Sequence, residues 1–485
     1  MIRSRRSRLD RWRSSVAAAA RAPVSGASLA AVRVAFGAVV VWEVWRYWSR
    51  GWIWRYYVEP EVRLTYFGWE WVPSLPYPAL LLLFGALAGA GGCLALGVRP
   101  RGAAAACAVG LGWVFLLEHG RYLNHFYLLV LLAALLALLP TGAAYRWRSW
   151  RAGTVGAWAV WAVRAQLGLV YTYAAIAKLN ADWLRGEPIA TWLQDDLAAS
   201  PLAFLLGWEH WGLLFAWGGI AIDGLAVPLL LWRRTRVPMA LALTAFHLFN
   251  AWVFTIGVFP WLMIALTPIF FAPDWPERWR QRTAPRLRAA SAVALRPSRP
   301  VALALAVFAM YQVLMPLRHW AYPGDVAWTE EGHRFSWRMK LRSKDATAAA
   351  FEVRTAEGAW LVDPADRLMP WQADKASTRP DLILAFAHRL RDEALAAGHE
   401  DVSVHAWIEI RLNGRPPQAF VDPEVDLAAQ PRSLAPKPWI LPLDLEGEGP
   451  RLFVWGWDGS APPARSGAMA RRVAVPRPLP PARGA

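Results

Sequence analysis

The chain has 485 residues, of which 56% are hydrophobic, and it carries a formal net charge of +17. Repeated runs of about 20 mostly apolar residues exclude an ordinary soluble enzyme and indicate a multi-pass membrane protein. The cations lie in short clusters between these runs and near the two termini, not in one stripe on a folded domain, which argues against a nucleic-acid partner.

The first 26 residues are basic and begin with a sequence similar to the start of a signal peptide. The apolar run after them lacks a convincing small-residue cleavage site. It ends in a tryptophan cluster, Trp42, Trp45, Trp48, Trp52 and Trp54. Tryptophans in this position are typical of the aromatic belt at the lipid headgroups. We therefore expect a basic cytoplasmic N-terminus over residues 1–26, followed by a retained first span.

Nine apolar stretches predict a helical transmembrane domain over residues 27–320. The fourth and the eighth are short for a full crossing. The stretches are approximately Ala27–Trp48, Pro78–Val98, Gly102–Leu117, Phe126–Leu139, Gly156–Ala177, Trp211–Trp232, Pro238–Ile256, Val258–Phe271 and Val301–Leu317.

Arginine clusters alternate with cation-poor loops, which fits the positive-inside rule with an odd number of spans. The clusters assigned to the cytoplasm are the N-terminus, Arg99 with Arg101, Arg146–Arg151, Arg233–Arg236 and Arg278–Arg299. The N-terminus is then cytoplasmic, and the C-terminal region lies on the opposite side. The loop after residue 178 faces that opposite side and is acidic, because it contains Asp182, Glu187, Asp195 and Asp196.

From about Asp325 the pattern changes to short alternating segments such as Ala349–Arg354, Val402–Leu412 and Arg451–Trp457. Asp381–Ala396 is predicted to form an amphipathic helix. We therefore expect an extramembrane β-rich or α+β domain over residues 325–460. The Pro- and Arg-rich residues 461–485 are expected to be a disordered tail.

One lysine, Lys178, occurs between Met1 and Met339, although lysine and arginine together number 53. It follows the apolar run Gly156–Ala177, and an ionisable residue at the end of a span is a functional candidate. A lysine amine shielded from water can act as a neutral base near pH 7, whereas a guanidinium cannot. We expect Lys178 to be the catalytic residue.

Helical spacing places Tyr171, and further along Arg164, on the same face as Lys178. Gln166 and Tyr173 likewise share a face of this helix. Polar groups within a span usually line a cavity rather than face lipid. The alternative is that Lys178 extends to the membrane interface and pairs with Asp182.

Two further pairs of polar residues are candidates for quinone or substrate binding. Asn124 and His125 open the fourth apolar stretch, where a histidine is more often structural than catalytic. His247 and Asn250 share one face of the seventh stretch, where they either donate hydrogen bonds to a bound oxygen or bridge helices. The nine histidines lack paired ligand spacing, so no metal site is expected.

Ordered matches over about residues 28–445 make the chain similar to the vitamin K-dependent γ-glutamyl carboxylase family, whose bacterial members carry an HTTM membrane domain. The matching segments are Ser28-Leu-Ala-Ala-Val-Arg-Val-Ala-Phe-Gly, Asn124-His-Phe-Tyr-Leu, Arg164–Trp183 with Lys-Leu-Asn-Ala-Asp-Trp, Asp223, Phe246-His-Leu-Phe-Asn, Ile256-Gly-Val-Phe, Pro268–Pro276, Ser336-Trp337 and Phe420–Asp426.

The resemblance implies a membrane lyase with two coupled half-reactions. The lysine matching Lys178 would deprotonate reduced vitamin K (phylloquinol or menaquinol), whose oxidation by O2 to the epoxide produces a strong base. That base would remove the γ-proton of a glutamate in a peptide or small acid, and the carbanion would add CO2. Leu361–Pro364 weakly matches the family's glutamate-binding region.

The family's second histidine has no counterpart in Pro140–Tyr145, which leaves a quinol epoxidase or oxygenase without carboxylation as an alternative. A transporter would explain the polar face of the fifth stretch and Asp223, although no repeat symmetry supports it. A non-catalytic membrane scaffold is the third reading. Replacing Lys178 separates the enzymes from the scaffold, because only the enzymes require it.

Overall fold

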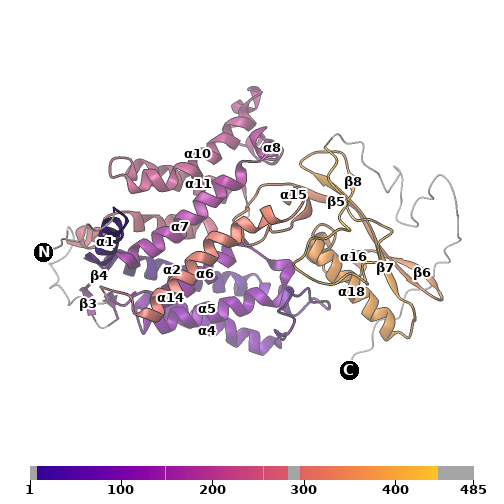
Figure 1. The fold of residues 1–485 in the computed structure, drawn as a ribbon, viewed down its shortest axis with the longest axis horizontal. Coiled ribbons are helices and arrows are strands. Elements are labelled where there is room, and N and C mark those ends of the chain that lie inside the picture. Colours follow the sequence, from indigo (N-terminus) through magenta and orange to yellow (C-terminus); the bar gives the residue numbers. More distant parts are fainter. Residues whose placement is uncertain (1–7, 148, 255, 282–294, 446–485) are drawn as a thin grey trace.

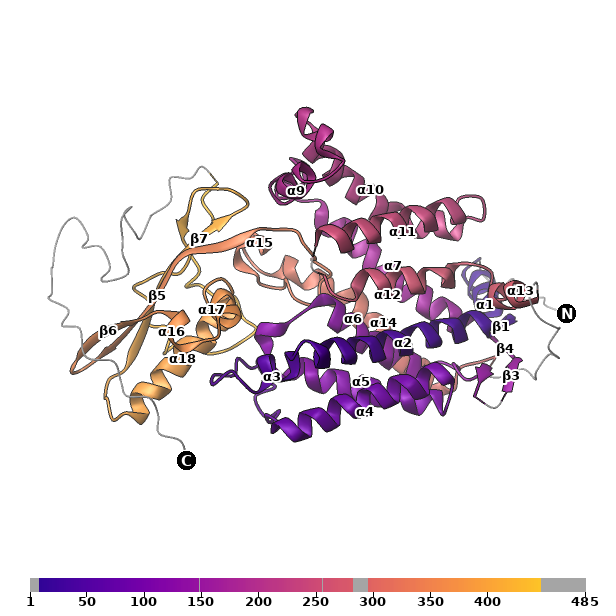
Figure 2. The same cartoon turned by 180° about the vertical axis from the view of Figure 1, so that it is seen from behind.

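The computed structural model describes residues 8–147, 149–254, 256–281 and 295–445 (Figure 1). Helices fill one end of an elongated molecule, and a region containing a four-stranded sheet forms the other end. The N-terminal helix α1 (Arg8–Arg21) lies at the end farthest from that sheet (Figure 2).

The first half of the helical region is built on close packing between two long helices. The elements are α2 (Ala27–Ser49), α3 (Trp52–Tyr57), α4 (Tyr77–Leu96), α5 (Pro100–Leu117), η1 (His119–Arg121) and α6 (Asn124–Leu138). A Cβ atom at Gly37 of α2 would lie 2.5 Å from the carbonyl oxygen of Gly91 on α4. Glycine at this crossing therefore allows the two backbones to approach, as is common in membrane helix pairs.

The second half of the helical region carries the candidate site. Its main elements are α7 (Ala157–Lys178), α8 (Ala181–Leu184), α9 (Ile189–Ala198), α10 (Trp211–Leu231), α11 (Arg236–Val253), α12 (Phe259–Leu266), η3 (Thr267–Phe270), α13 (Trp275–Gln281) and α14 (Arg299–Leu314). Two small antiparallel pairs, β1 (Pro23–Ser25) with β4 (Thr154–Gly156) and β2 (Ala144–Arg146) with β3 (Ser149–Ala152), lie near α1.

All nine apolar stretches fall on helices, and five of these helices are long and apolar enough to cross a membrane. The five are Ala27–Ser49, Tyr77–Leu96, Pro100–Leu117, Trp211–Leu231 and Arg299–Ala321. Helix α7 has 22 residues, which is sufficient length, but its polar side chains Arg164, Gln166 and Lys178 reduce its hydropathy. A multi-pass helical architecture is thus confirmed, whereas nine crossings remain a prediction.

The C-terminal region contains an antiparallel sheet in the order β6-β5-β7-β8. Its strands are β5 (Lys344–Thr355), β6 (Gly358–Val362), β7 (Ser403–Leu412) and β8 (Gln418–Ala419), and helix α18 (Pro380–Ala396) packs on them. The rings of Phe386 on α18 and Phe351 on β5 lie 4.9 Å apart. The two predicted strands in this range and the predicted helix are confirmed, whereas Arg451–Trp457 and the tail lie outside the described residues.

Hydrogen bonds join the helical region to the C-terminal region at several points. The backbone N–H of Phe335 donates to the Tyr122 hydroxyl over 2.6 Å. The amide of Gln372, on α17 (Pro370–Ala376), donates to the Val62 carbonyl over 2.8 Å and to the Glu118 carboxylate over 3.3 Å. The two regions therefore share a polar junction, at the end of the helical region where α7 finishes.

Candidate active site

Lys178 is the last residue of α7 and is 8% exposed. Its ammonium nitrogen donates a 2.5 Å hydrogen bond to the Asp223 carboxylate of α10, which is 4% exposed. A second, longer contact of 3.5 Å joins it to the carbonyl oxygen of Ala174, one turn earlier. Two opposite charges buried this deeply are costly unless they are paired, so the position of each side chain depends on the other.

An apolar cover separates Lys178 from solvent. The Trp183 ring lies 5.4 Å from the lysine nitrogen, and its indole N–H donates to the Ala216 carbonyl over 2.9 Å. A Cβ atom at Gly219 would lie 3.6 Å from the Lys178 side chain. Trp183 also belongs to a buried cluster with Ala177, Leu193 and Leu341, a setting that restricts the access of water to the amine.

Asp182 does not take part in the ion pair of Lys178. Its carboxylate accepts hydrogen bonds from both terminal nitrogens of Arg415, over 2.6 and 2.7 Å, and from the Asn413 amide over 2.7 Å. Burial alone would raise the pKa of Asp182, but the hydrogen bonds from Arg415 and Asn413 outweigh it and keep the pKa below its ordinary value. We call Asp182, Asn413 and Arg415 the Asp182 clamp, because they tie the segment after α7 to the end of β7.

Tyr171 and His247 form a second buried pair near the middle of the helical region. The Tyr171 hydroxyl lies 2.9 Å from Nε2 of His247, and the two residues are 3% and 2% exposed. The other ring nitrogen of His247, Nδ1, is buried and has no hydrogen-bond partner among the described residues. Phe246 and Phe259 lie against the histidine ring. A ring nitrogen of this kind, set among aromatic rings, can hydrogen-bond a hydroxyl or carbonyl oxygen of a flat ring.

Arg164 and Asn250 are bonded to backbone carbonyls. Arg164 donates to the carbonyls of Ile269 and Phe271 over 2.9 and 2.8 Å, so it fixes the end of η3. The Asn250 amide donates to the Phe246 carbonyl over 2.9 Å on its own helix. These two candidates therefore make structural contacts, and they are not brought together with Lys178.

Asn124 and His125 lie in a different polar group. Asn124 accepts a 2.9 Å hydrogen bond from the Tyr122 hydroxyl. His125 lies beside Gly257, where an added Cβ atom would be 2.9 Å from its Nε2 atom. Gly257 has a φ of +63° and leads directly to Phe259, the residue against His247. The segment from Gly257 to Phe259 is thus the link between His125 and His247.

The polar side chains of α7 contact several different neighbouring helices. Lys178 pairs with α10 and Tyr171 with α11, whereas Gln166 and Tyr173 both face α14. The Gln166 amide donates to Gln312 over 3.3 Å, and the Tyr173 hydroxyl donates to the Val313 carbonyl over 2.6 Å. The periodicity thus predicted the shared orientation of Gln166 and Tyr173, but not which helix they contact.

The stretch Pro140–Tyr145 lies at the end of the helical region remote from Lys178. It follows α6, and it leads into the β2–β3 pair close to α1 (Figure 2). Arg33 holds it there by donating to the carbonyls of Thr141 and Tyr145 over 3.0 and 2.7 Å. A histidine in this stretch would therefore not reach the surroundings of Lys178.

Arg415 and Asn413 are not among the site residues predicted from the sequence, and Asp223 appears there as a matching position and in the transporter alternative, not as the partner of Lys178. Asp223 carried one usable signal, because it is an isolated carboxylate inside an apolar run. The contact of Asn413 with Asp182, 231 residues away, has no local signal in the sequence.

Comparison with known protein families matches residues 21–275 to the HTTM domain. Residues 297–446 match the vitamin K-dependent gamma-carboxylase lumenal domain. No solved structure matches the chain. The first match covers more than half of the chain, and the two domains follow each other in sequence. The chain therefore belongs to the vitamin K-dependent gamma-carboxylase family.

Proposed function

We propose that this protein is a membrane enzyme that couples oxygen-dependent epoxidation of reduced vitamin K to carboxylation of glutamate. Family membership supports the use of reduced vitamin K, O2 and CO2. The observation that carries the proposal is the buried Lys178–Asp223 pair at the end of α7. It offers one amine, shielded from water, next to a group that can hold its proton.

In the proposed mechanism Lys178 acts as the base. The ion pair has the same net charge as a neutral amine beside a protonated carboxyl group. Moving one proton from Lys178 to Asp223 along their 2.5 Å hydrogen bond therefore frees the amine without adding a net charge to the interior. The amine can then accept a proton from a bound hydroxyl group. An arginine in place of Lys178 could not do this, because its guanidinium stays protonated.

The residues present suit a reduced quinone. The buried Nδ1 atom of His247 is unsatisfied within the part of the chain that the structure describes, and Tyr171 fixes the other side of its ring. These two residues would hold one oxygen of the ring, between Phe246 and Phe259. When bound, reduced vitamin K supplies the oxidation by O2 that makes removal of the weakly acidic γ-proton of glutamate possible. Trp183 and its apolar neighbours would keep water away from Lys178 during this chemistry.

We further propose nine membrane crossings, a cytoplasmic N-terminus and a C-terminal domain on the opposite side, with domain boundaries near residues 27, 320, 325 and 460. Helices α1 and α13 lie at the end of the helical region farthest from the sheet (Figure 2). This arrangement supports placing the N-terminus and the C-terminal domain on opposite sides of the membrane. The basic clusters at that end would contact anionic lipid.

An epoxidase without carboxylation is less favoured by the geometry. This alternative depends on the missing histidine in Pro140–Tyr145, and that stretch is remote from Lys178.

The test is to incubate membranes containing the protein with reduced vitamin K, O2, labelled bicarbonate and a glutamate-rich peptide. Epoxide and γ-carboxyglutamate are quantified together by mass spectrometry. We expect both products. Epoxide alone with a range of peptides and free acids would favour the epoxidase, and neither product from folded protein, with menaquinol also tried, would contradict the proposed function.

A further inference from the structure

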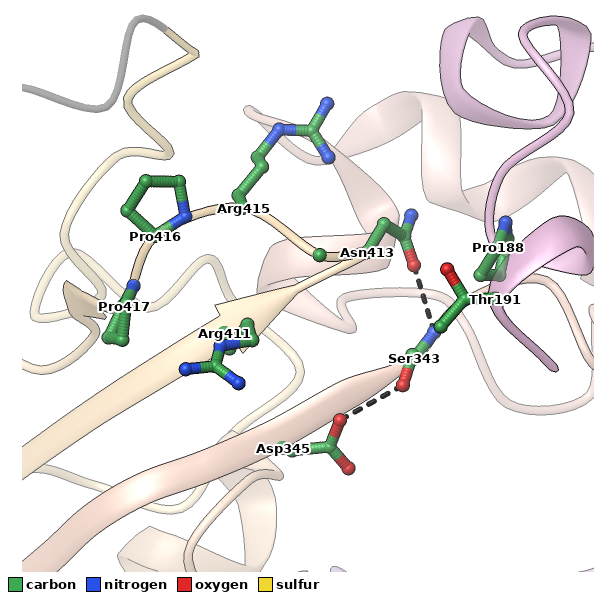
Figure 3. A pocket seen from close by; sticks show the side chains of 10 residues that line it. Pro188, Thr191, Ser343, Asp345, Arg411, Asn413, Arg415, Pro416 and Pro417 are labelled. Carbon is green, nitrogen blue, oxygen red and sulfur yellow. Dashed lines mark hydrogen bonds between the residues drawn. The ribbon is translucent and has the colours of Figure 1, made fainter. Parts of the chain in front are cut away.

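A cavity of about 420 Å³ lies at the junction between the helical region and the sheet (Figure 3). Pro188 and Thr191 line one side, from the chain after α7. Ser343 and Asp345, where β5 begins, line another side. The rest of the wall comes from Arg411 and the turn of residues 413–417 at the end of β7. Ligand pockets typically have volumes of about 300–1,000 Å³, so this cavity is large enough for a side chain with part of its backbone.

The cavity is directly connected to the segment that carries Lys178. Two of its lining residues, Asn413 and Arg415, are the members of the Asp182 clamp that hold Asp182, four residues after Lys178. Asn413 also accepts a 2.8 Å hydrogen bond from the backbone N–H of Ser343. The same residues therefore form the cavity wall and fix the position of the chain beside the proposed base.

The polar lining side chains differ in whether they already make a hydrogen bond. The Asp345 carboxylate accepts a 2.9 Å hydrogen bond from the Ser343 hydroxyl, and the Thr191 hydroxyl donates one of 2.9 Å to Glu187, which is not a lining residue. Arg415 is bonded to Asp182.

Arg411 is different. It is exposed, and within the described part of the chain it makes no side-chain hydrogen bond or ion pair. It stands opposite Asp345 in the β5–β7 register, and both side chains point to the same side of the strands (Figure 3), yet they do not form an ion pair. Among the described lining residues, Arg411 is thus the charged side chain without a hydrogen-bond partner, and its planar donor pair matches a carboxylate.

We propose that this cavity binds the carboxylate of a glutamate side chain in an acidic peptide, with Arg411 donating the hydrogen bonds. This inference rests on the proposed function, because it supplies a docking site for the glutamate substrate.

The weakly matching segment Leu361–Pro364 is less well placed for this role. Leu361 pairs with Glu352 on β5, eight residues along the strand from Lys344, where the cavity lies. At about 3.3 Å per residue, this separation is roughly 26 Å along the sheet. Strand β5 begins at the end that faces the helical region, where Ser343 and Asp345 line the cavity, whereas β6, which contains Leu361, lies toward the other end of the sheet (Figure 1).

The experiment measures peptide binding to the purified full-length protein in detergent, without turnover. The probes are a short peptide with several glutamates and the same peptide with glutamine at those positions. The variants are Arg411→Gln, Arg411→Lys and the matched control Arg367→Gln. Arg367 is an exposed arginine on α16 (Pro364–Arg367), so its replacement removes the same charge from a different part of the same region. Unchanged thermal unfolding midpoints establish that the variants are folded.

We expect Arg411→Gln to weaken binding of the glutamate peptide about tenfold, as the loss of a charge-assisted hydrogen bond predicts. The glutamine peptide should bind wild type and variant equally, Arg411→Lys should restore part of the affinity, and Arg367→Gln should have no effect. Equal affinities of wild type and Arg411→Gln, an equal loss in Arg367→Gln, or no preference of wild type for glutamate would each overturn the inference. Product formation is measured separately, so failure of the proposed function would be distinguishable from failure of this site.

Discussion

The amine of Lys178 and the carboxylate of Asp223 lie 2.5 Å apart, although 45 residues separate them in the sequence. The pair joins the end of α7 to α10, and both side chains are buried. Each buried charge requires the other, because a single charge at this depth would have no opposite charge to compensate it. The pair should therefore affect both the stability of the fold and the reaction rate, and the two effects can be measured separately.

Removal of one partner should destabilise the protein more than removal of both. We expect Lys178→Met or Asp223→Leu alone to reduce the free energy of unfolding by about 3–5 kcal/mol, because an unpaired charge stays buried. The double variant should lose clearly less than the sum of the two single losses. Thermal unfolding in detergent checks this, and additive losses would show that the two side chains do not interact.

Asp223→Asn should retain the shape of the site but remove the group that receives the lysine proton. We expect the rate of epoxide formation to fall about 10²-fold or more, with a smaller change in KM for the quinol. The pH–rate profile should also lose or shift the limb that depends on the pair. Wild-type rates and an unchanged profile would mean that Asp223 only stabilises the fold.

His247→Phe should weaken quinol binding. The substitution keeps an aromatic ring between Phe246 and Phe259 but removes Nδ1, so KM for the quinol should rise about tenfold. Asn250→Ala is the matched comparison on α11, because its amide already bonds to the Phe246 carbonyl. Steady-state kinetics with varied quinol would contradict this assignment if both variants changed KM equally.

Arg415→Ala should loosen the segment after α7 without removing any reacting group. The loss of the paired hydrogen bonds to Asp182 should increase hydrogen exchange over residues 180–188 and lower kcat several-fold. Arg415→Lys should restore only part of the exchange protection and part of kcat, since an ammonium cannot make the two parallel contacts. Exchange rates equal to those of wild type would show that the Asp182 clamp does not position this segment.

Glu118 should make the stability depend on pH. It lies in the loop after α5, and burial raises its pKa to about 8, against hydrogen bonds from Gly120 and Leu64 that lower it. An unfolded glutamate has a pKa of about 4.3, so the stability due to protonated Glu118 is complete below that pH and is lost as the pH rises through about 8.

We therefore expect the unfolding midpoint of Glu118→Gln, relative to wild type, to increase by several degrees between pH 5 and pH 9. Thermal unfolding across this range measures the difference. A constant difference at all pH values would contradict the raised pKa of Glu118.

The helices could be predicted from the sequence because the extent of an apolar run indicates where a helix begins and ends. The predicted stretch Ala27–Trp48 differs from α2 by one residue at its end, and Asp381–Ala396 differs from α18 by one at its start. The facing pair Gln166 and Tyr173 also followed from helical periodicity. Each of these depends on neighbours within a few turns.

The partners of Lys178 and Asp182 could not be predicted in the same way. From the sequence, Asp182 is the carboxylate nearest to Lys178 and one helical turn away, which favoured a local pair. In the fold, α7 ends at Lys178 and α8 begins at Ala181, so the direction of the chain changes between the two residues. Asp182 then meets Arg415, and Asp223 replaces it as the partner of Lys178. Such pairings depend on tertiary packing, which local spacing does not contain.

The most direct test of the central claim compares Lys178→Ala and Lys178→Arg with the control Lys375→Ala, a half-buried lysine on α17. Each is incubated as membranes with reduced vitamin K, O2, labelled bicarbonate and a glutamate-rich peptide, and epoxide and γ-carboxyglutamate are quantified. If Lys178 is the base, both Lys178 variants lose both products by about 10²–10⁴-fold while the control matches wild type. Undiminished products from folded Lys178→Ala would contradict the assignment of Lys178.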